Sequence, residues 1–239
     1  MDTTSPSTTT TPEEDRLVHL FDKAFDYVNQ HRRRYTRPTV VFDIDNTLVW
    51  HESVRAATAT AGQSVSSQEP EPDRVVYRTH PVQPAVSFVQ RIQTLRHPEV
   101  TLVFLTARQC DGQLQQCDAH VFPTGPCVAD MTNLSFTRAE LESIGCWHPQ
   151  PSSSVGDECK LFVMPRTVFP SLHTTTPYDC GLQTSLFKTT IRNVLEKRLG
   201  HTILLNIGDQ PTDHTGLHFA NHLCYQAHPL RIVSTSTFS

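Results

Sequence analysis

Four aspartates stand directly after two apolar runs of the sequence. Asp43 and Asp45, which would project the same way if the strand continued, follow one run, and Asp209 and Asp213 follow another. Burying unpaired charge is costly, so these carboxylates must face a cation or solvent. An all-oxygen site of a few carboxylates with room for water is what magnesium prefers. Any one aspartate alone could be a helix-cap or turn residue, but four together favour a metal site.

Apolar patterns along the chain alternate between strands and helices. Continuous β-branched runs predict strands covered on both faces, and apolar residues three or four apart predict amphipathic helices. This alternation indicates an α/β protein with a doubly wound parallel sheet, in which ligands bind beyond the carboxyl ends of strands. We therefore expect acidic and hydroxyl residues at these ends to converge. The predicted strands are 39–42, 100–105, 161–164, 202–207 and 222–226, and the predicted helices are 84–95, 136–144, 185–199 and one from residue 11 to the arginine run.

Length and composition fit one domain. The 239 residues suffice for one well-packed α/β core and are too few for two large ones. Residues 1–10 are mostly Thr, Ser and Pro, which predicts a disordered tail before a domain at 11–239. Insertions are expected near 51–80 and 109–130, where no clear period exists, and the Pro- and Thr-rich stretch 165–183 is expected to be a loop.

Charge, cysteines and the first residues narrow the class of protein. The net charge is −4, the pI is near 6.3, and most basic residues are scattered. The cluster at 31–34 with Arg37 could touch a phosphate backbone, but it would equally complement the dipole at a helix end. Seven cysteines without a CxxC pair argue against a disulfide framework and favour a reducing compartment. Without a signal-peptide pattern or a membrane-length apolar run, we expect a soluble, cytoplasmic protein.

Four motifs resemble, in order, the four signatures of the haloacid dehalogenase (HAD) superfamily. The segment Val40–Leu48 resembles the first signature, hhhhDxDxT, and the strand that ends at Thr106 resembles the second. Lys188 matches the third signature, and Gly208–Asp213 matches the fourth. The resemblance implies a Rossmann-like, three-layer α/β/α core with strand order 5-4-1-2-3 and small cap insertions.

Within the superfamily, further stretches are similar to the class B acid phosphatases and to the plant acid phosphatase and vegetative storage proteins. These stretches are Thr106-Ala107-Arg108, Lys188-x-x-x-Arg192 and 206–213. The similarity covers about residues 38–50 and 84–226 and is strong only at the motifs. It implies a hydrolase that acts on a small phosphomonoester.

The resemblance also implies a role for each motif residue. Asp43 would attack phosphorus to form an aspartyl-phosphate, and Asp45 would protonate the leaving oxygen and later activate water. Thr106 would hydrogen-bond a phosphoryl oxygen, and Lys188 would neutralise charge on the phosphoryl group and Asp43. The residues expected to contact substrate are Asn46, Thr106, Ala107, Arg108 and Lys188, although Arg108 could equally pair with a carboxylate.

By the same resemblance, the cofactor would be Mg²⁺. Asp43, the backbone carbonyl of Asp45 and Asp209 would hold it, while Asp213 would bridge through water or to Lys188. A rival for the phosphate-facing lysine is Lys160, but it opens the third predicted strand and would lie at the amino end of the sheet. Lys188 is expected to precede or start its helix, near amides that favour an anion.

Two other functions stay open. The chain could be a nucleotide or nucleic-acid end-phosphatase, which would be favoured if the basic run at 31–37 lay beside the site. It could also be a non-catalytic HAD-like binding or storage protein. The presence of both Asp43 and Asp45 argues against that function, because pure binding does not need a nucleophile and an acid together.

Several side chains outside the motifs have more than one interpretation. Either Trp50 or His51, just past the first signature, could line the substrate pocket. His214 and His218 could meet substrate, although surface histidines are more common. Ordinary thiols are a better interpretation of these cysteines than a zinc site, because the spacing C-x6-C-x2-H-x6-C is not a tight knuckle pattern. That spacing belongs to Cys110, Cys117, His120 and Cys127.

Overall fold

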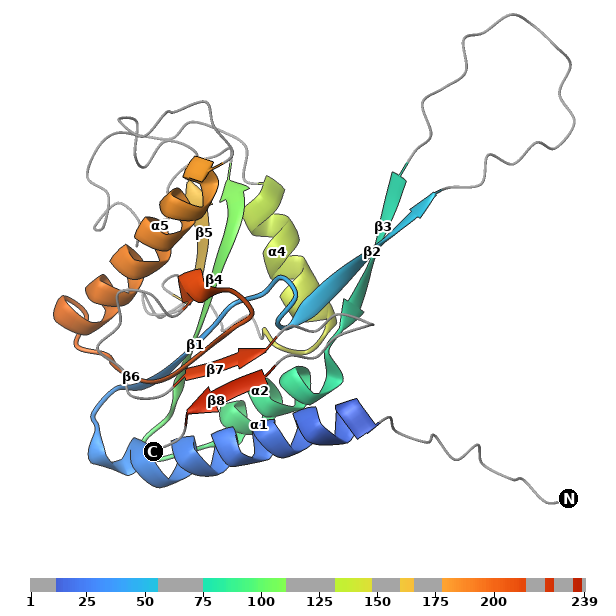
Figure 1. Ribbon diagram of the computed structural model, residues 1–239. Coiled ribbons are helices and arrows are strands. Elements are labelled where there is room, and N and C mark those ends of the chain that lie inside the picture. Colours follow the sequence, from blue (N-terminus) through green and yellow to red (C-terminus); the bar gives the residue numbers. More distant parts are fainter. Residues whose placement is uncertain are drawn as a thin grey trace, which may run out of the picture.

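A central sheet with helices on both sides makes up most of the described part of the chain (Figure 1). The computed structural model describes residues 12–55, 75–110, 132–147, 160–165, 178–213, 222–225 and 234–237. The tail predicted at 1–10 and nearly all of the insertion expected at 109–130 lie outside these residues.

The central sheet has the strand order β5-β4-β1-β6-β7-β8, with the first five strands parallel and β8 antiparallel to β7. Numbered along the chain, the parallel strands take the predicted order 5-4-1-2-3. The α/β class and the parallel sheet are therefore confirmed. The strands are β1 (Pro38–Phe42), β4 (Thr101–Cys110), β5 (Leu161–Pro165), β6 (Thr202–Gly208), β7 (His222–Tyr225) and β8 (Ser234–Thr237).

Helices cover the sheet on its two faces. On one face, α1, α2 and α4 share a core with alternate residues of the strands, and on the other α5 does so. The two faces are visible in Figure 1, where α5 and α1 lie on different sides of β1. The described elements thus form three layers, α/β/α. The helices are α1 (Pro12–His31), the short η1 (Arg32–Arg34), α2 (Gln83–Thr94), α4 (Thr132–Ser143), α5 (Tyr178–Lys197) and the short η3 (Pro211–Asp213).

The central strand β1 shows why a continuous apolar run folds this way. All of its residues are buried. Val41 packs toward α5, whereas Phe42 packs toward α1 and α2. The Phe42 ring lies 6.4 Å from that of Phe21 and 6.1 Å from that of Phe88. Each fully buried side chain of this kind contributes about 1.5–3 kcal/mol, so the strand that carries the first motif is firmly anchored.

A β-hairpin projects from the core in the region where a small insertion is expected, near 51–80. Its strands are β2 (Val49–Arg55) and β3 (Val75–Pro81), paired antiparallel as a separate sheet. Figure 1 shows this hairpin extending away from the body of the protein. Residues 51–55 and 75–80 therefore form regular structure within the region where an insertion is expected. The sequences of the two strands show no alternation of apolar and polar residues, so the pattern does not predict them as strands.

Two further expectations were wrong at the level of element boundaries. The loop predicted at 165–183 ends earlier, because α5 begins at Tyr178, immediately after the last proline of that stretch. The polar C-terminal stretch contains β8, whose residues are all Ser and Thr and give no apolar pattern. Among the helices of the described residues, none combines the length and apolar content that crossing a membrane requires.

Candidate active site

The chain turns sharply where β1 ends. The Asp43 amide still donates to the Ile207 carbonyl of β6 at 2.8 Å, and the Ile44 carbonyl then accepts from the Leu48 amide at 2.8 Å. Asn46 lies in this turn with a φ of 57°, a left-handed conformation that asparagine tolerates better than most residues. The strand geometry therefore does not continue to Asp45, and the two carboxylates of the first motif meet different partners.

Asp43 is buried beside Lys188. The Lys188 ammonium lies 2.5 Å from Asp43 Oδ1 and 2.5 Å from Asp213 Oδ1. Only 3% of Lys188 is exposed, and it reaches the site from the middle of α5. The expected contact with Asp213 is present, but the expected place of Lys188 at a helix start is wrong. Lys160 immediately precedes β5, at the amino end of the sheet, as predicted.

Negative charge exceeds positive charge around Asp43. Burial raises the pKa of Asp43 to about 8; Lys188 opposes this shift, and Asp213 and Asp209 add to it. Burial acts to lower the pKa of Lys188, but the charges of Asp43 and Asp213 outweigh it, so that pKa lies above its ordinary value. Burial likewise raises the pKa of Asp209. Three carboxylates face the Lys188 ammonium and the Arg192 guanidinium, whose charge also acts on Asp43 and Asp213, so the cluster has room for a further positive charge.

Carboxylate oxygens of Asp43, Asp209 and Asp213 lie within 4.8 Å of one another. Oxygen ligands with an excess of negative charge suit Mg²⁺. The oxygens of Asp213 have other partners as well, since Oδ2 accepts the Gln210 amide at 2.9 Å and Oδ1 contacts Lys188. Asp43 and Asp209 are therefore the better candidates for direct ligands. The Asp45 carboxylate does not belong to this group, which leaves only its backbone carbonyl as a candidate.

Glycine is required next to this cluster. A side chain carbon at position 208 would overlap the Asp213 carboxylate. The Asn206 side-chain amide contacts the Asp213 backbone carbonyl, and Arg192 Nη2 donates to the Thr212 carbonyl at 3.0 Å. Burial lowers the pKa of Arg192 to about 10, against the charges of Asp213 and Asp43. The buried side chains of Asn206 and Arg192 thus hold the turn after β6, which fixes the position of Asp213.

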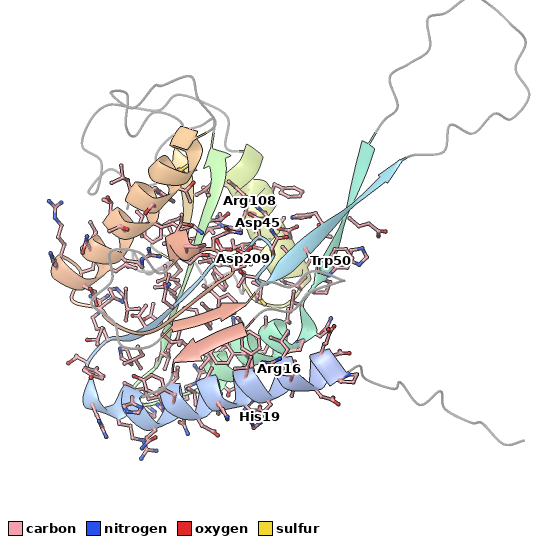
Figure 2. All side chains as sticks on the ribbon, viewed as in Figure 1. Arg16, His19, Asp45, Trp50, Arg108 and Asp209 are labelled. Carbon is pink, nitrogen blue, oxygen red and sulfur yellow. The ribbon has the colours of Figure 1, made fainter. Side chains whose placement is uncertain are left out.

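Asp45 lies in cationic surroundings. Arg108 Nε lies 3.0 Å from each Asp45 oxygen, and Arg108 Nη2 donates to Oδ1 at 2.7 Å. The buried Thr106 hydroxyl donates to Asp45 Oδ2 at 3.0 Å. Burial acts to raise the pKa of Asp45, but the hydrogen bonds and charge of Arg108 outweigh it and hold that pKa below its ordinary value. Figure 2 shows Asp45, Arg108 and Asp209 close together in the upper middle of the view, away from Arg16 and His19 of α1 at the bottom.

Arg108 also contacts residues that no sequence motif indicated. Its Nη1 lies 2.7 Å from Glu140 Oε2 and donates to Thr137 Oγ1 at 3.1 Å, both on α4. Its Nη2 lies 3.2 Å from His51 Nε2 of β2. Glu140 in turn accepts a hydrogen bond from the Thr79 hydroxyl of β3 at 2.9 Å. No signal in the sequence could have found Glu140 or Thr79, because each is one ordinary polar residue in an element whose placement is set by tertiary structure.

Strand alternation separates Trp50 from His51. His51 Nε2 lies 3.4 Å from Asp45 Oδ1, so His51 borders the site. Trp50 belongs to the other face of the hairpin and stacks on His80 of β3, with ring centroids 4.2 Å apart. Of these two candidates for the pocket lining, the structure brings only His51 to Asp45.

The remaining sequence candidates contribute less to this geometry. Asn46 is exposed, and Ala107 is partly buried between Thr106 and Arg108. Cys110 ends β4, whereas Cys117, His120, Cys127, His214 and His218 lie outside the described residues.

No family model and no curated protein matches the sequence.

Proposed function

We propose that the chain is a magnesium-dependent HAD-type phosphatase that hydrolyses a small phosphomonoester through an aspartyl-phosphate. The observation that carries this proposal is the convergence at Asp43. A carboxylate at the end of a central parallel strand is bound by a buried lysine and lies among further carboxylates, and a second aspartate stands two residues on. A phosphoryl group placed here would meet a nucleophile, a cation and an acid together.

In the first step, a carboxylate oxygen of Asp43 forms a bond to phosphorus and the bond from phosphorus to the leaving oxygen breaks. The leaving oxygen keeps that electron pair and takes a proton from Asp45, so the alcohol departs neutral. Lys188 stabilises the negative charge on the phosphoryl oxygens. Thr106 can hydrogen-bond the same group once its hydroxyl turns away from Asp45.

In the second step, water attacks the phosphorus of the aspartyl-phosphate. Asp45, now a carboxylate, takes a proton from that water as the new bond forms. The bond between phosphorus and the Asp43 oxygen breaks, and its electrons return to the Asp43 carboxylate. Inorganic phosphate leaves, and Asp45 holds the proton that the next cycle needs.

A bound Mg²⁺ would supply charge neutralisation for the phosphoryl group and would help to orient it. Asp43 and Asp209 would hold the ion with the Asp45 backbone carbonyl. Asp213 would orient Lys188, which it contacts.

The basic run at 31–37 would favour the nucleic-acid alternative if it lay beside the site, but it lies elsewhere. Arg32 donates to the Arg96 and Pro98 carbonyls, which precede β4, and Arg37 donates to the Leu199 carbonyl, which precedes β6. The run therefore lies at the amino ends of the strands. β1 separates it from Asp43 by five residues, roughly 17 Å of extended chain.

The proposal is tested with a panel of phosphomonoesters, including alkyl phosphates, mononucleotides and phosphorylated oligonucleotides, with and without Mg²⁺. Magnesium-dependent release of inorganic phosphate from the purified protein, absent in Asp43→Asn, is the expected result. A folded protein that releases no phosphate from any of these compounds would favour the non-catalytic alternative. Preference for phosphorylated oligonucleotides would favour the end-phosphatase instead.

A further inference from the structure

The carboxylate of Glu140 is buried in a cluster that the two proposed steps do not use. We name the side chains of Arg108, Glu140, Thr79 and His51 the Glu140 cluster. The Glu140 side chain is only 5% exposed, and it bridges Arg108 of the central sheet and Thr79 of the hairpin. A buried ion pair stabilises a fold little more than apolar residues of the same volume would, so stability alone is a poor explanation for it.

The hydrogen bonds of the cluster fix where its protons lie. Thr79 has one hydroxyl proton, which goes to Glu140 Oε1 at 2.9 Å. His51 Nδ1, 3.2 Å from the same hydroxyl, must then donate to it, so Nδ1 carries a hydrogen. His51 Nε2 lies 3.2 Å from Arg108 Nη2 and 3.4 Å from Asp45 Oδ1.

These contacts leave the Arg108 guanidinium one orientation. Nη1 donates to Thr137 and forms an ion pair with Glu140, both on α4, while Nη2 is shared between His51 and Asp45. Nε then points to the Asp45 carboxylate. The planar guanidinium presents its donors in a fixed fork, so anchoring one end determines where the other end points.

We infer that Glu140 is a positioning residue for proton transfer by Asp45, an inference that rests on the proposed function. Glu140 holds the guanidinium, and the guanidinium sets the direction of the Asp45 carboxylate. Thr79 and His51 complete the anchor, which makes the base of the hairpin part of the catalytic site. A proton donor displaced by about 1 Å can lose roughly 10²-fold in rate.

The test compares two substrates that differ in their need for a proton. An alkyl phosphate must lose a poor leaving group and needs Asp45, whereas dinitrophenyl phosphate loses a stable phenolate without protonation. For Glu140→Gln, kcat/KM, which reports the first step, should fall roughly tenfold to 10²-fold for the alkyl phosphate and change little for dinitrophenyl phosphate. Asp45→Asn should give the same pattern with a larger loss, and Glu142→Gln, an exposed neighbour on α4, should match the wild type.

Thr79 gives a second, milder test should Glu140→Gln fail to fold. Thr79→Val removes the hydroxyl that holds Glu140 and should show a smaller loss, again selective for the alkyl phosphate. Thr79→Ser keeps the hydroxyl and should restore wild-type values. Equal losses for both substrates, or no loss in either variant, overturn the positioning role. A wild-type protein that hydrolyses neither substrate overturns the proposed function itself, so the two failures are distinguishable.

Discussion

Asp43 and Asp45 are two residues apart in sequence and lie in opposite electrostatic surroundings. Asp43 is buried among carboxylates, with Lys188 as its cationic partner, on the side of the sheet that α5 covers. Asp45 is more exposed and is bound by Arg108, with Thr106 and His51 beside it. Burial raises the pKa of Asp43 to about 8, whereas Arg108 outweighs burial and lowers the pKa of Asp45.

This difference bears on the proposed chemistry. In these surroundings Asp43 favours its protonated form and Asp45 its ionised form, the reverse of what the first step requires. A divalent cation beside Asp43 favours the ionised form of that residue. A phosphoryl group beside Arg108 would offset part of the positive charge of that residue and so favour the protonated form of Asp45. In the proposed mechanism the two carboxylates would therefore depend on two different partners, the cation for Asp43 and the substrate for Asp45.

The largest expected effect separates the two aspartates by activity. Asp43→Asn should abolish turnover, because no other group can form the bond to phosphorus. Asp45→Asn should cost roughly 10² or more through the loss of acid catalysis. Phosphate release by purified variants measures both effects, and Asp26→Asn on the exposed face of α1 is the matched control. Near-normal activity of Asp43→Asn would rule it out as the nucleophile.

Lys188 tests the surroundings of Asp43 alone. Lys188→Ala should reduce turnover by roughly 10² or more, because a preorganised positive charge at the phosphoryl group is lost. It should also lower the free energy of unfolding by about 3–5 kcal/mol, since two buried carboxylates lose their partner. Lys160→Ala and Lys197→Ala should leave turnover nearly unchanged. A larger loss of turnover in Lys160→Ala than in Lys188→Ala would contradict the assignment.

The cation requirement should follow Asp209. Chelation should remove activity and added Mg²⁺ should restore it, while Asp209→Ala should raise the Mg²⁺ concentration that half-restores activity. Mg²⁺ at a hundred times its dissociation constant should stabilise the wild-type fold by about 2.7 kcal/mol, visible as a rise in Tm. In Asp209→Ala the same rise in Tm should need a higher Mg²⁺ concentration than in the wild type. Activity that survives exhaustive chelation, or that returns only with zinc, would contradict the magnesium assignment.

The sequence predicts that Lys188 faces Asp43, but neither the place of Lys188 in its helix nor the surroundings of the two residues. Continuous apolar runs predict the parallel strands because a strand covered on both faces must be apolar throughout. The start of α5 was missed because the repeated Thr and Pro before Tyr178 resemble a loop. The hairpin was missed because its two strands show no alternation of apolar and polar residues. Glu140 could not be predicted at all, since its contact with Arg108 requires α4 to be packed beside β4.

Opposite effects on stability should distinguish the same two aspartates as the pH changes. In chelator, the folded state keeps the Asp43 proton up to about pH 8, whereas the unfolded chain loses it near about pH 4. The free energy of unfolding should therefore fall between these values as pH rises. Asp43→Asn removes this dependence, so the variant should gain stability relative to the wild type from about pH 5 to about pH 8.

The contribution of Asp45 to the free energy of unfolding should not change over the same pH range. Its pKa in the folded state lies below the ordinary value, so its stabilising contribution is complete above about pH 5 and is lost only in stronger acid. Asp45→Asn should thus lower the free energy of unfolding by an amount that is constant from about pH 5 to about pH 8. Urea unfolding of the three proteins across this range measures both differences. A constant difference for Asp43→Asn, or a changing one for Asp45→Asn, would mean that the two carboxylates do not differ in their surroundings as the structure has them.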